Sequence, residues 1–227
     1  MSKLAFIFPG QGAQKAGMGK DFYENSETAR SFFDQAQKIL DFDLKEMCFG
    51  EHEELNLTEY TQPCMVSVCL AIVQELKKRG INPDITAGLS LGEYAAVAAA
   101  GGMNELDAIK LVRRRGILMQ STVPAGEGAM AAVLGLDAKK IEEILESFEN
   151  VWIANYNCPG QIVITGLTNE VQQASLALKE AGAKRVVELK VSGPFHSQLL
   201  KPAGEALLKE MESMSFSTLQ VPYVANA

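Results

Sequence analysis

Residues 84–92, DITAGLSLG, limit the possible folds of this chain more than any other segment. A short apolar run ends at Gly88, Ser90 follows between two glycines, and an alanine-rich helical pattern begins at once. Gly-x-Ser-x-Gly between a strand and a helix is typical of the nucleophile elbow, a sharp turn that presents a serine hydroxyl for covalent chemistry. The start of the helix then places free N–H groups and a positive dipole end beside that hydroxyl. A simple Gly-Ser-Gly turn with no chemical role is the alternative interpretation.

Hydrophobic periodicity on both sides of this turn predicts an α/β fold with a short parallel sheet. Near the end of the chain a helix and one more strand are expected, at residues 198–214 and 220–227. Together with the elbow, this order predicts a hydrolase-like core. The remaining strands of this core are expected at residues 3–8 and 84–89, and its helices at about 27–40, 59–79, 92–100 and 105–121.

The middle of the chain follows a different pattern. Residues 128–191 alternate as strand, helix, strand, strand, helix and strand, which is the order of the ferredoxin-like fold. The change begins after the break at residues 124–126 and ends near Gly193. We therefore expect an inserted ferredoxin-like subdomain at 126–193. The hydrolase-like core would then consist of 1–125 and 194–227, with its C-terminal part incomplete.

Composition and charge narrow the classes of function. The 227 residues carry a formal net charge of −7, which argues against a nucleic-acid partner because such proteins usually show a basic excess. No segment has the form of a signal peptide or the length of a membrane span, so we expect a cytoplasmic protein without a membrane partner. The four cysteines lack the spacing of a metal site, so no metal is expected.

A serine nucleophile needs a base within hydrogen-bond reach, and the chain has two histidines. His52 lies in the acidic stretch GEHEELN and is interpreted as a solvated surface residue. His196 lies in VSGPFHSQLL, where Gly193 and Pro194 define the backbone just before it. A lone loop histidine is more often structural than catalytic, but no other residue serves easily as the base. His196 is therefore the candidate.

Further motifs are spread along the whole chain: FPGQGAQ, GLSLGEY, LVRRRGILMQ, GEGAMAAVLGL, IANYNCPGQIVITG and SGPFHSQLLKPA. Through these segments the sequence resembles the malonyl-CoA:acyl-carrier-protein transacylases, an acyltransferase family of fatty acid biosynthesis, over essentially its whole length. Several separate motifs in one order are far more specific than any one of them alone.

The resemblance implies a set of site residues and a reaction. Ser90 would be the nucleophile and His196 the base. The backbone N–H groups of Gln11 and Leu91 would form the oxyanion hole, and Arg115 would pair with the malonyl carboxylate. The implied enzyme moves a malonyl group from malonyl-CoA to the phosphopantetheine thiol of acyl carrier protein through a malonyl-serine ester, without a cofactor.

Helical periodicity points to Arg115 independently of the resemblance. Over residues 105–121, Arg115 falls in the middle of an apolar arc, whereas Arg114 falls on the polar sector and Arg113 is ambiguous. An inward guanidinium needs an anion, because an unpaired buried charge is very costly. That anion is either a glutamate of the chain or a substrate carboxylate held by the two-pronged guanidinium.

Three further segments are interpreted with alternatives. The loop PGQGAQKAGMG lacks the spacing of the Walker and Rossmann phosphate motifs, so it is expected either to supply the Gln11 oxyanion donor or to be a plain turn. Asn155 and Asn157 either line the cleft between the domains, where Asn157 would bind substrate, or act as capping and turn residues. Phe195 resembles the malonyl-type pattern of the family, and its ring is expected to crowd an α-methyl group.

Two features depart from the family pattern. Leu89 directly precedes the candidate nucleophile, at a position where family members often have a histidine. That histidine does not act as the catalytic base in the family, so we expect the difference to have a small effect. Family members also continue beyond the position of Ala227 with a segment that completes the sheet and helps to orient the catalytic imidazole, so the group that orients His196 is unassigned. A serine thioesterase or esterase of α/β-hydrolase type is one alternative, although its usual HGGG-type loop is replaced by GQG. A truncated, catalytically impaired fragment is the other.

Overall fold

The computed structural model describes residues 3–124, 126–189, 191 and 193–226. Its internal contacts divide the chain into two compact units. The core unit comprises Met1–Ile117 and Leu207–Ala227, and the second unit comprises Leu118–Ala206. The second unit contains the predicted insert at 126–193 together with residues on either side of it, and the exact limits of an inserted domain stay a prediction.

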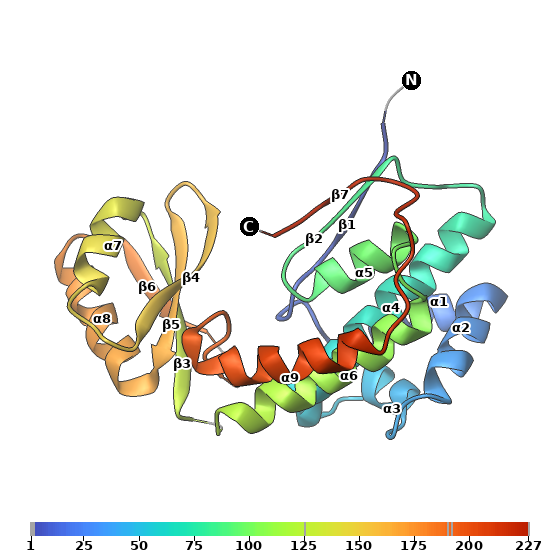
Figure 1. The fold of residues 1–227 in the computed structure, drawn as a ribbon, viewed down its shortest axis with the longest axis horizontal. Coiled ribbons are helices and arrows are strands. Elements are labelled where there is room, and N and C mark those ends of the chain that lie inside the picture. Colours follow the sequence, from blue (N-terminus) through green and yellow to red (C-terminus); the bar gives the residue numbers. More distant parts are fainter. Residues whose placement is uncertain (1–2, 125, 190, 192, 227) are drawn as a thin grey trace. The chain divides into compact units, whose positions relative to one another are not determined.

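A three-stranded parallel sheet organises the core unit (Figure 1). Its order is β1 (Ala5–Phe8), β2 (Ile85–Gly88) and β7 (Tyr223–Val224). Strand β2 pairs with β1 along its whole length, from Ala5 opposite Ile85 to Phe8 opposite Gly88. The predicted α/β class with a short parallel sheet is confirmed, and the last strand is shorter than predicted because only two of its residues pair with β2.

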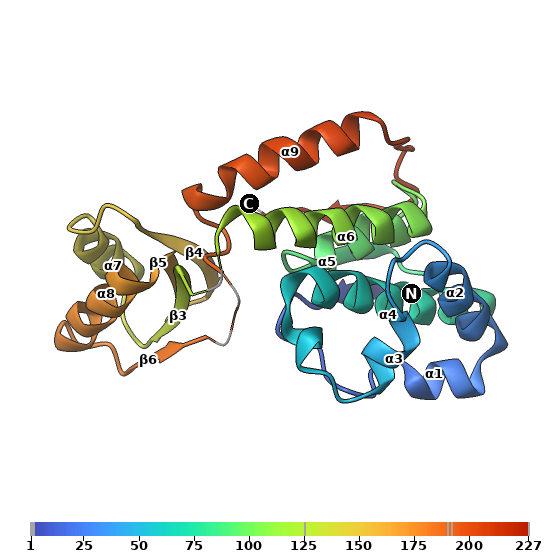
Figure 2. The ribbon, with the colours of Figure 1, turned by 90° about the horizontal axis from the view of Figure 1, so that it is seen from below.

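Helices pack against the core sheet, although Ile7 of β1 stays 77% exposed. Helix α5 (Gly92–Ala99) follows β2 directly, and α4 (Thr58–Lys78) is the longest helix of the unit. Figures 1 and 2 show α1 (Lys20–Asn25), α2 (Glu27–Gln37) and α3 (Leu44–Phe49) grouped beside α4. The unit also holds the short 3₁₀ helix η1 (Glu53–Asn56), most of α6 (Glu105–Thr122) and the end of α9 (Lys201–Glu212). Fully buried Phe33, Leu70 and Ile109 belong to one continuous apolar core.

The second unit is an antiparallel sheet with two helices, and its elements follow the predicted order. The strands are β3 (Gly128–Leu134), β4 (Val151–Cys158), β5 (Gln161–Leu167) and β6 (Arg185–Glu188), arranged β4-β5-β3-β6. Helix α7 (Ala138–Leu145) connects β3 to β4, and α8 (Thr168–Glu180) connects β5 to β6. Both helices lie on one face of the sheet (Figure 1), around a core that includes Ile141, Ile164 and Leu178. This strand order is that of the ferredoxin-like fold.

In the part of the chain that the structure describes, no helix is both long and apolar enough to span a membrane. The short 3₁₀ helix η2 (Gln198–Leu200) precedes α9 and completes the elements of the second unit.

Candidate active site

Ser90 lies at the turn between β2 and α5, as the sequence predicts. Its φ is 50°, in the left-handed region that residues other than glycine rarely adopt. Such backbone strain costs about 1–3 kcal/mol and persists only where the surrounding structure enforces it. Ser90 is half-buried, so its side chain keeps access to solvent. This backbone supports the nucleophile-elbow interpretation over a simple turn.

The two glycines around Ser90 are required by the close approach of three backbone segments. A Cβ atom on Gly88 would lie 2.1 Å from the carbonyl carbon of Gly92. A Cβ atom on Gly92 would lie 2.4 Å from the carbonyl oxygen of Phe8, at the end of β1. Since no side chain fits at either position, the Gly-x-Ser-x-Gly spacing follows from the packing of β1, β2 and the first turn of α5.

The N–H groups at the start of α5 are mostly occupied. The N–H groups of the first three helical residues, 92–94, each donate to the carbonyl oxygen of the residue three positions earlier, at 2.9–3.2 Å. The Ser90 N–H donates to the Asn226 side-chain oxygen at 2.6 Å. For the Leu91 N–H, no hydrogen-bond acceptor lies among the described residues. This N–H is therefore an open donor directly beside Ser90, as an oxyanion hole requires.

The Gly-rich loop after β1 packs against the elbow. A Cβ atom on Gly10 would lie 2.9 Å from the carbonyl oxygen of Leu89, so the two backbones nearly touch. The Gln11 side chain donates to the Thr58 hydroxyl at 3.1 Å and accepts from the Gln62 amide at 3.5 Å, and both partners are fully buried in α4. The Gln11 N–H, like that of Leu91, lacks an acceptor within the part of the chain that the structure describes.

Thr58 and Gln62 were not singled out from the sequence. They lie 47 and 51 residues from Gln11 along the chain, and no local pattern signals the contact. Their effect is to fix the Gln11 side chain, which in turn restricts the backbone of the loop.

Arg115 lies on α6. Its guanidinium carbon stands 5.4 Å from the ring centroid of Tyr94, a residue of α5. The residue is half-buried. Among the described residues, no carboxylate lies within 4.0 Å of its guanidinium nitrogens. An internal salt bridge therefore has no support here, and the guanidinium remains available to an external carboxylate.

The two neighbouring arginines behave differently. Arg114 is exposed and pairs with Glu210 at 2.9 Å. Arg113, which helical periodicity left ambiguous, is largely buried and bonds to Asp41 at 2.9 Å and Glu59 at 3.1 Å. Its guanidinium also stacks on the rings of Phe42 and Tyr60. Arg113 is thus the arginine that serves the internal structure.

The candidate base belongs to the second unit. His196 is exposed and has a φ of 58°, the only other non-glycine residue with positive φ among those described. A Cβ atom on Gly128 would lie 2.2 Å from the Pro194 ring, so this ring packs directly on β3. The Ser197 hydroxyl donates to the Pro194 carbonyl at 2.7 Å. The imidazole is therefore carried by a tight, anchored turn, and its meeting with Ser90 stays a prediction.

Phe195 and Asn157 also lie in the second unit. The Phe195 side chain is 8% exposed and belongs to an apolar cluster with Met130 and Val163. This burial gives the ring a packing role, and its predicted contact with substrate remains a prediction. Asn157 is exposed near the end of β4, and Asn155 is half-buried on the same strand.

His52 lies at the surface, in line with its interpretation from the sequence. Its side chain is 33% exposed, and its Nε2 lies 3.0 Å from the exposed Glu46 carboxylate. Gly50 allows this position, because a Cβ atom there would lie 2.6 Å from Nε2. No cluster of three or more potential metal ligands occurs in the described residues.

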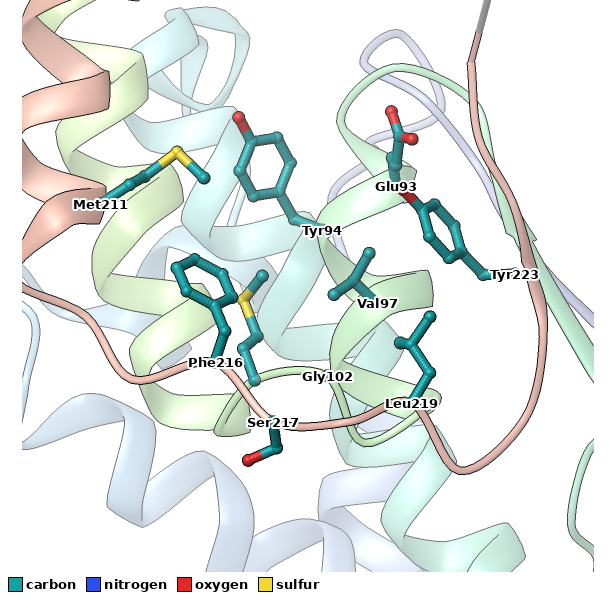
Figure 3. A pocket seen from close by; sticks show the side chains of 10 residues that line it. Glu93, Tyr94, Val97, Gly102, Met211, Phe216, Ser217, Leu219 and Tyr223 are labelled. Atoms are coloured by element: carbon teal, nitrogen blue, oxygen red, sulfur yellow. The ribbon is translucent and has the colours of Figure 1, made fainter.

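A separate apolar pocket of about 420 Å³ lies in the core unit (Figure 3). Figure 3 shows Tyr94, Met211 and Phe216 gathered around it. Ser90 is not among its lining residues, whereas Glu93 and Tyr94 of the helix that follows the elbow are. The lining residues are Glu93, Tyr94, Val97, Gly102, Met103, Met211, Phe216, Ser217, Leu219 and Tyr223.

Known proteins match this chain over nearly its whole length. The malonyl CoA-acyl carrier protein transacylase of Bacillus subtilis (strain 168) is 47% identical over 231 aligned residues, which cover the whole chain and 73% of that protein. The protein of the same name from Staphylococcus aureus (strain MRSA252) is 44% identical, with coverage of 100% and 74%. The chain thus spans about three quarters of the length of these relatives.

Solved structures show the same similarity. An acyl carrier protein S-malonyltransferase from Vibrio cholerae superposes with a TM-score of 0.94 at 41% identity, over 99% of this chain and 75% of that one. A malonyl-transacylase in complex with its type II PKS acyl-carrier protein gives a TM-score of 0.95 at 40% identity, over 99% and 74%. The family described as acyl transferase domain matches residues 5–226. With nearly its full length matched, the chain belongs to the acyl transferase domain family.

Proposed function

We infer that this chain transfers a malonyl group from malonyl-CoA to the phosphopantetheine thiol of acyl carrier protein, through a malonyl ester on Ser90. The relatives named above carry this activity in their names and match the whole chain. The observation that carries the proposal is the backbone of Ser90, held at a φ of 50° beside the open N–H of Leu91. A strained serine next to an open donor is suited to acyl transfer.

In the first half-reaction, His196 takes the hydroxyl proton while the Ser90 oxygen attacks the thioester carbonyl. The N–H groups of Gln11 and Leu91 donate to the oxyanion of the tetrahedral intermediate. The intermediate collapses as the carbon–sulfur bond breaks, and His196 returns the proton to the departing thiolate of coenzyme A. The malonyl group is then an ester on Ser90.

In the second half-reaction, the phosphopantetheine thiol takes the place of coenzyme A. His196 accepts the thiol proton, and the sulfur attacks the ester carbonyl to form a second tetrahedral intermediate in the same oxyanion hole. Ser90 leaves with the proton from His196, and the malonyl thioester of the carrier protein is released. Each half exchanges one acyl bond for another and moves no electrons to or from an external acceptor, so the chemistry needs no cofactor.

Arg115 accounts for the choice of acyl group in this proposal. Its guanidinium lies in the same unit as Ser90, is half-buried and has no carboxylate partner among the described residues. A bidentate pair with the distal carboxylate of malonate would orient the ester carbonyl toward the incoming thiol. An acetyl group lacks that carboxylate and would not use the pair. Phe195, as a proposed wall against an α-methyl group, would add selection for malonyl over methylmalonyl.

Acyl transfer is separated from thioester hydrolysis by following both products. The chain is incubated with labelled malonyl-CoA, with and without acyl carrier protein that bears its phosphopantetheine arm, and malonyl carrier protein and free malonate are quantified. We expect transfer to the carrier protein to exceed release of malonate by far. Release of malonate at a rate that does not depend on the carrier protein would instead support a thioesterase. Absence of both products would identify the chain as an impaired fragment.

A further inference from the structure

Asn226, which the proposed mechanism does not use, makes three contacts with the elbow. Its side-chain oxygen accepts from the Ser90 N–H at 2.6 Å, and its side-chain nitrogen donates to the Gly88 carbonyl at 2.6 Å. Its own backbone N–H donates to the Glu93 carboxylate at 3.2 Å. The partners lie 133–138 residues away along the chain. One side chain therefore spans the turn from the end of β2 to the nucleophile.

The Asn226 side chain extends the β2–β7 ladder beyond the last paired residues. Thr86 pairs with Tyr223 and Ala87 with Val224, and no further pair of these two strands forms in the described part of the chain. If the parallel ladder continued in the same register, the backbone N–H of residue 226 would donate to the carbonyl of residue 88, and its backbone C=O would accept from the N–H of residue 90. Asn226 offers its side-chain NH₂ and C=O to these two residues instead, while its backbone N–H turns to Glu93. The amide thus replaces a ladder step where β2 bends into the elbow.

This replacement affects the donors available at the elbow. Because the Ser90 N–H is engaged by Asn226, the open donor at the turn is that of Leu91. The two bonds fix the peptide groups on both sides of Leu89, and the second of these is the peptide that leads into Ser90, whose φ is 50°. Removal of the amide would leave the strained backbone free to relax and the Ser90 N–H free to take water or to compete for the oxyanion.

We propose that Asn226 is a positioning residue for the nucleophile: its side chain clamps Gly88 and Ser90 and so holds the Ser90 hydroxyl in its reactive position. Glu93 orients Asn226 through the backbone N–H. The proposal rests on Ser90 being the nucleophile of the proposed function, but it does not depend on which acyl group is transferred. Asn226 touches the backbone of the elbow and acts through Ser90.

The test uses substitutions of Asn226 in the full chain. Asn226→Ala removes both side-chain bonds. Asn226→Asp keeps an acceptor for the Ser90 N–H but, when ionised, loses the donor to the Gly88 carbonyl and places a second negative charge near Glu93. When protonated, the introduced carboxyl group can again donate to Gly88 and accept from Ser90. Asn82→Asp, at an exposed position before β2, is the control for added charge.

Two readouts follow the reactivity of Ser90. One is the single-turnover rate of Ser90 malonylation by malonyl-CoA, and the other is the labelling rate by a fluorophosphonate probe, which reports a reactive serine whatever its natural acyl group. Both are measured across a pH series and expressed as the ratio of variant to parent, because titration of the base affects both chains alike. Thermal unfolding midpoints are recorded in parallel.

We expect Asn226→Ala to slow both reactions by about tenfold to a hundredfold, with a ratio that does not change with pH. The Asn226→Asp ratio should rise toward one as the pH falls. Glu93→Gln in the same chain should move this recovery to lower pH, because loss of the neighbouring negative charge favours the ionised form of the introduced carboxyl group. Asn82→Asp should react at the parent rate.

Equal labelling by all chains would overturn the proposal, as would a loss in Asn226→Asp that does not recover in acid. A purely structural role would lower the unfolding midpoint without producing an acid-dependent ratio. If malonyl-CoA fails to acylate the parent chain, the proposed function is wrong, and the fluorophosphonate arm still decides the role of Asn226.

Discussion

Replacement of Arg115 by methionine tests the proposed selection of malonyl groups. Arg115→Met keeps most of the aliphatic stem and removes the guanidinium that stands 5.4 Å from the Tyr94 ring. No carboxylate among the described residues lies within 4.0 Å of this guanidinium. Removal of the guanidinium therefore breaks no salt bridge among these residues. The effect on catalysis should therefore arise from the substrate contact.

The magnitude follows from the geometry of the pair. Hydrogen bonds to charged groups contribute about 1.5–3 kcal/mol each, and a bidentate guanidinium–carboxylate pair makes two of them. Because Arg115 is half-buried and partly screened by water, the lower end of that sum, about 3 kcal/mol, applies. At 1.36 kcal/mol per tenfold change, kcat/KM for malonyl-CoA should fall on the order of a hundredfold.

The assay compares malonyl-CoA with acetyl-CoA as donors to acyl carrier protein. The value of kcat/KM for acetyl-CoA should change by less than about threefold, because an acetyl group has no carboxylate that could pair with Arg115. Arg114→Met, one position earlier on α6, is the matched control, since Arg114 is exposed and pairs with Glu210. A malonyl-to-acetyl ratio that stays the same in Arg115→Met would refute the reasoning, as would an equal shift in Arg114→Met.

Three further predictions concern the scaffold. Gly88→Ala should lower the free energy of unfolding by about 2 kcal/mol or more, because the added Cβ would lie 2.1 Å from the Gly92 backbone. Gly204→Ala is the control and should be neutral or stabilising, because no atom lies within 4 Å of the added Cβ. Equal midpoints of the two variants in urea titrations would contradict this prediction. Arg113 lowers the pKa of Asp41 below its usual 3.8 through a hydrogen bond, so the pair stabilises the fold above that pH and loses its effect as the pH falls through the lower folded-state pKa. Asp41→Asn should therefore destabilise by under about 1 kcal/mol at neutral pH and not at all in strong acid, and a difference that persists there would count against the pairing. A thiol reagent should modify exposed Cys158 quickly and the other cysteines only on unfolding. Burial raises the pKa of Cys69 to about 11, which keeps this thiol protonated and unreactive. Rapid modification of a second cysteine in the native chain would contradict the prediction.

Local sequence patterns were sufficient to predict most of the elements. The strand, Gly-x-Ser-x-Gly turn and helix around Ser90 are encoded within fifteen residues, from Ile85 to Ala99, and the structure has them where the pattern indicates. The strand and helix order of the second unit is likewise a matter of local periodicity. Helices α1 and α3 were missed because each has only six residues, too few for a clear amphipathic repeat.

Contacts between distant segments could not be predicted from one sequence. Periodicity placed Arg113 between two apolar neighbours, but its burial depends on Asp41 and Glu59, which lie 72 and 54 residues away. The clamp by Asn226 likewise joins positions more than 130 residues apart. An asparagine just after a short strand carries no signal of such a role, because asparagine is common in turns.

The central claim is that Ser90 forms a covalent malonyl ester. Its most direct test is the intact mass of the chain after brief exposure to malonyl-CoA, followed by peptide mapping of the modified residue. The account predicts one malonyl group per chain, located on Ser90, lost on addition of carrier protein with its phosphopantetheine arm and absent in Ser90→Ala. An unmodified chain, or an adduct that persists in Ser90→Ala, would contradict it.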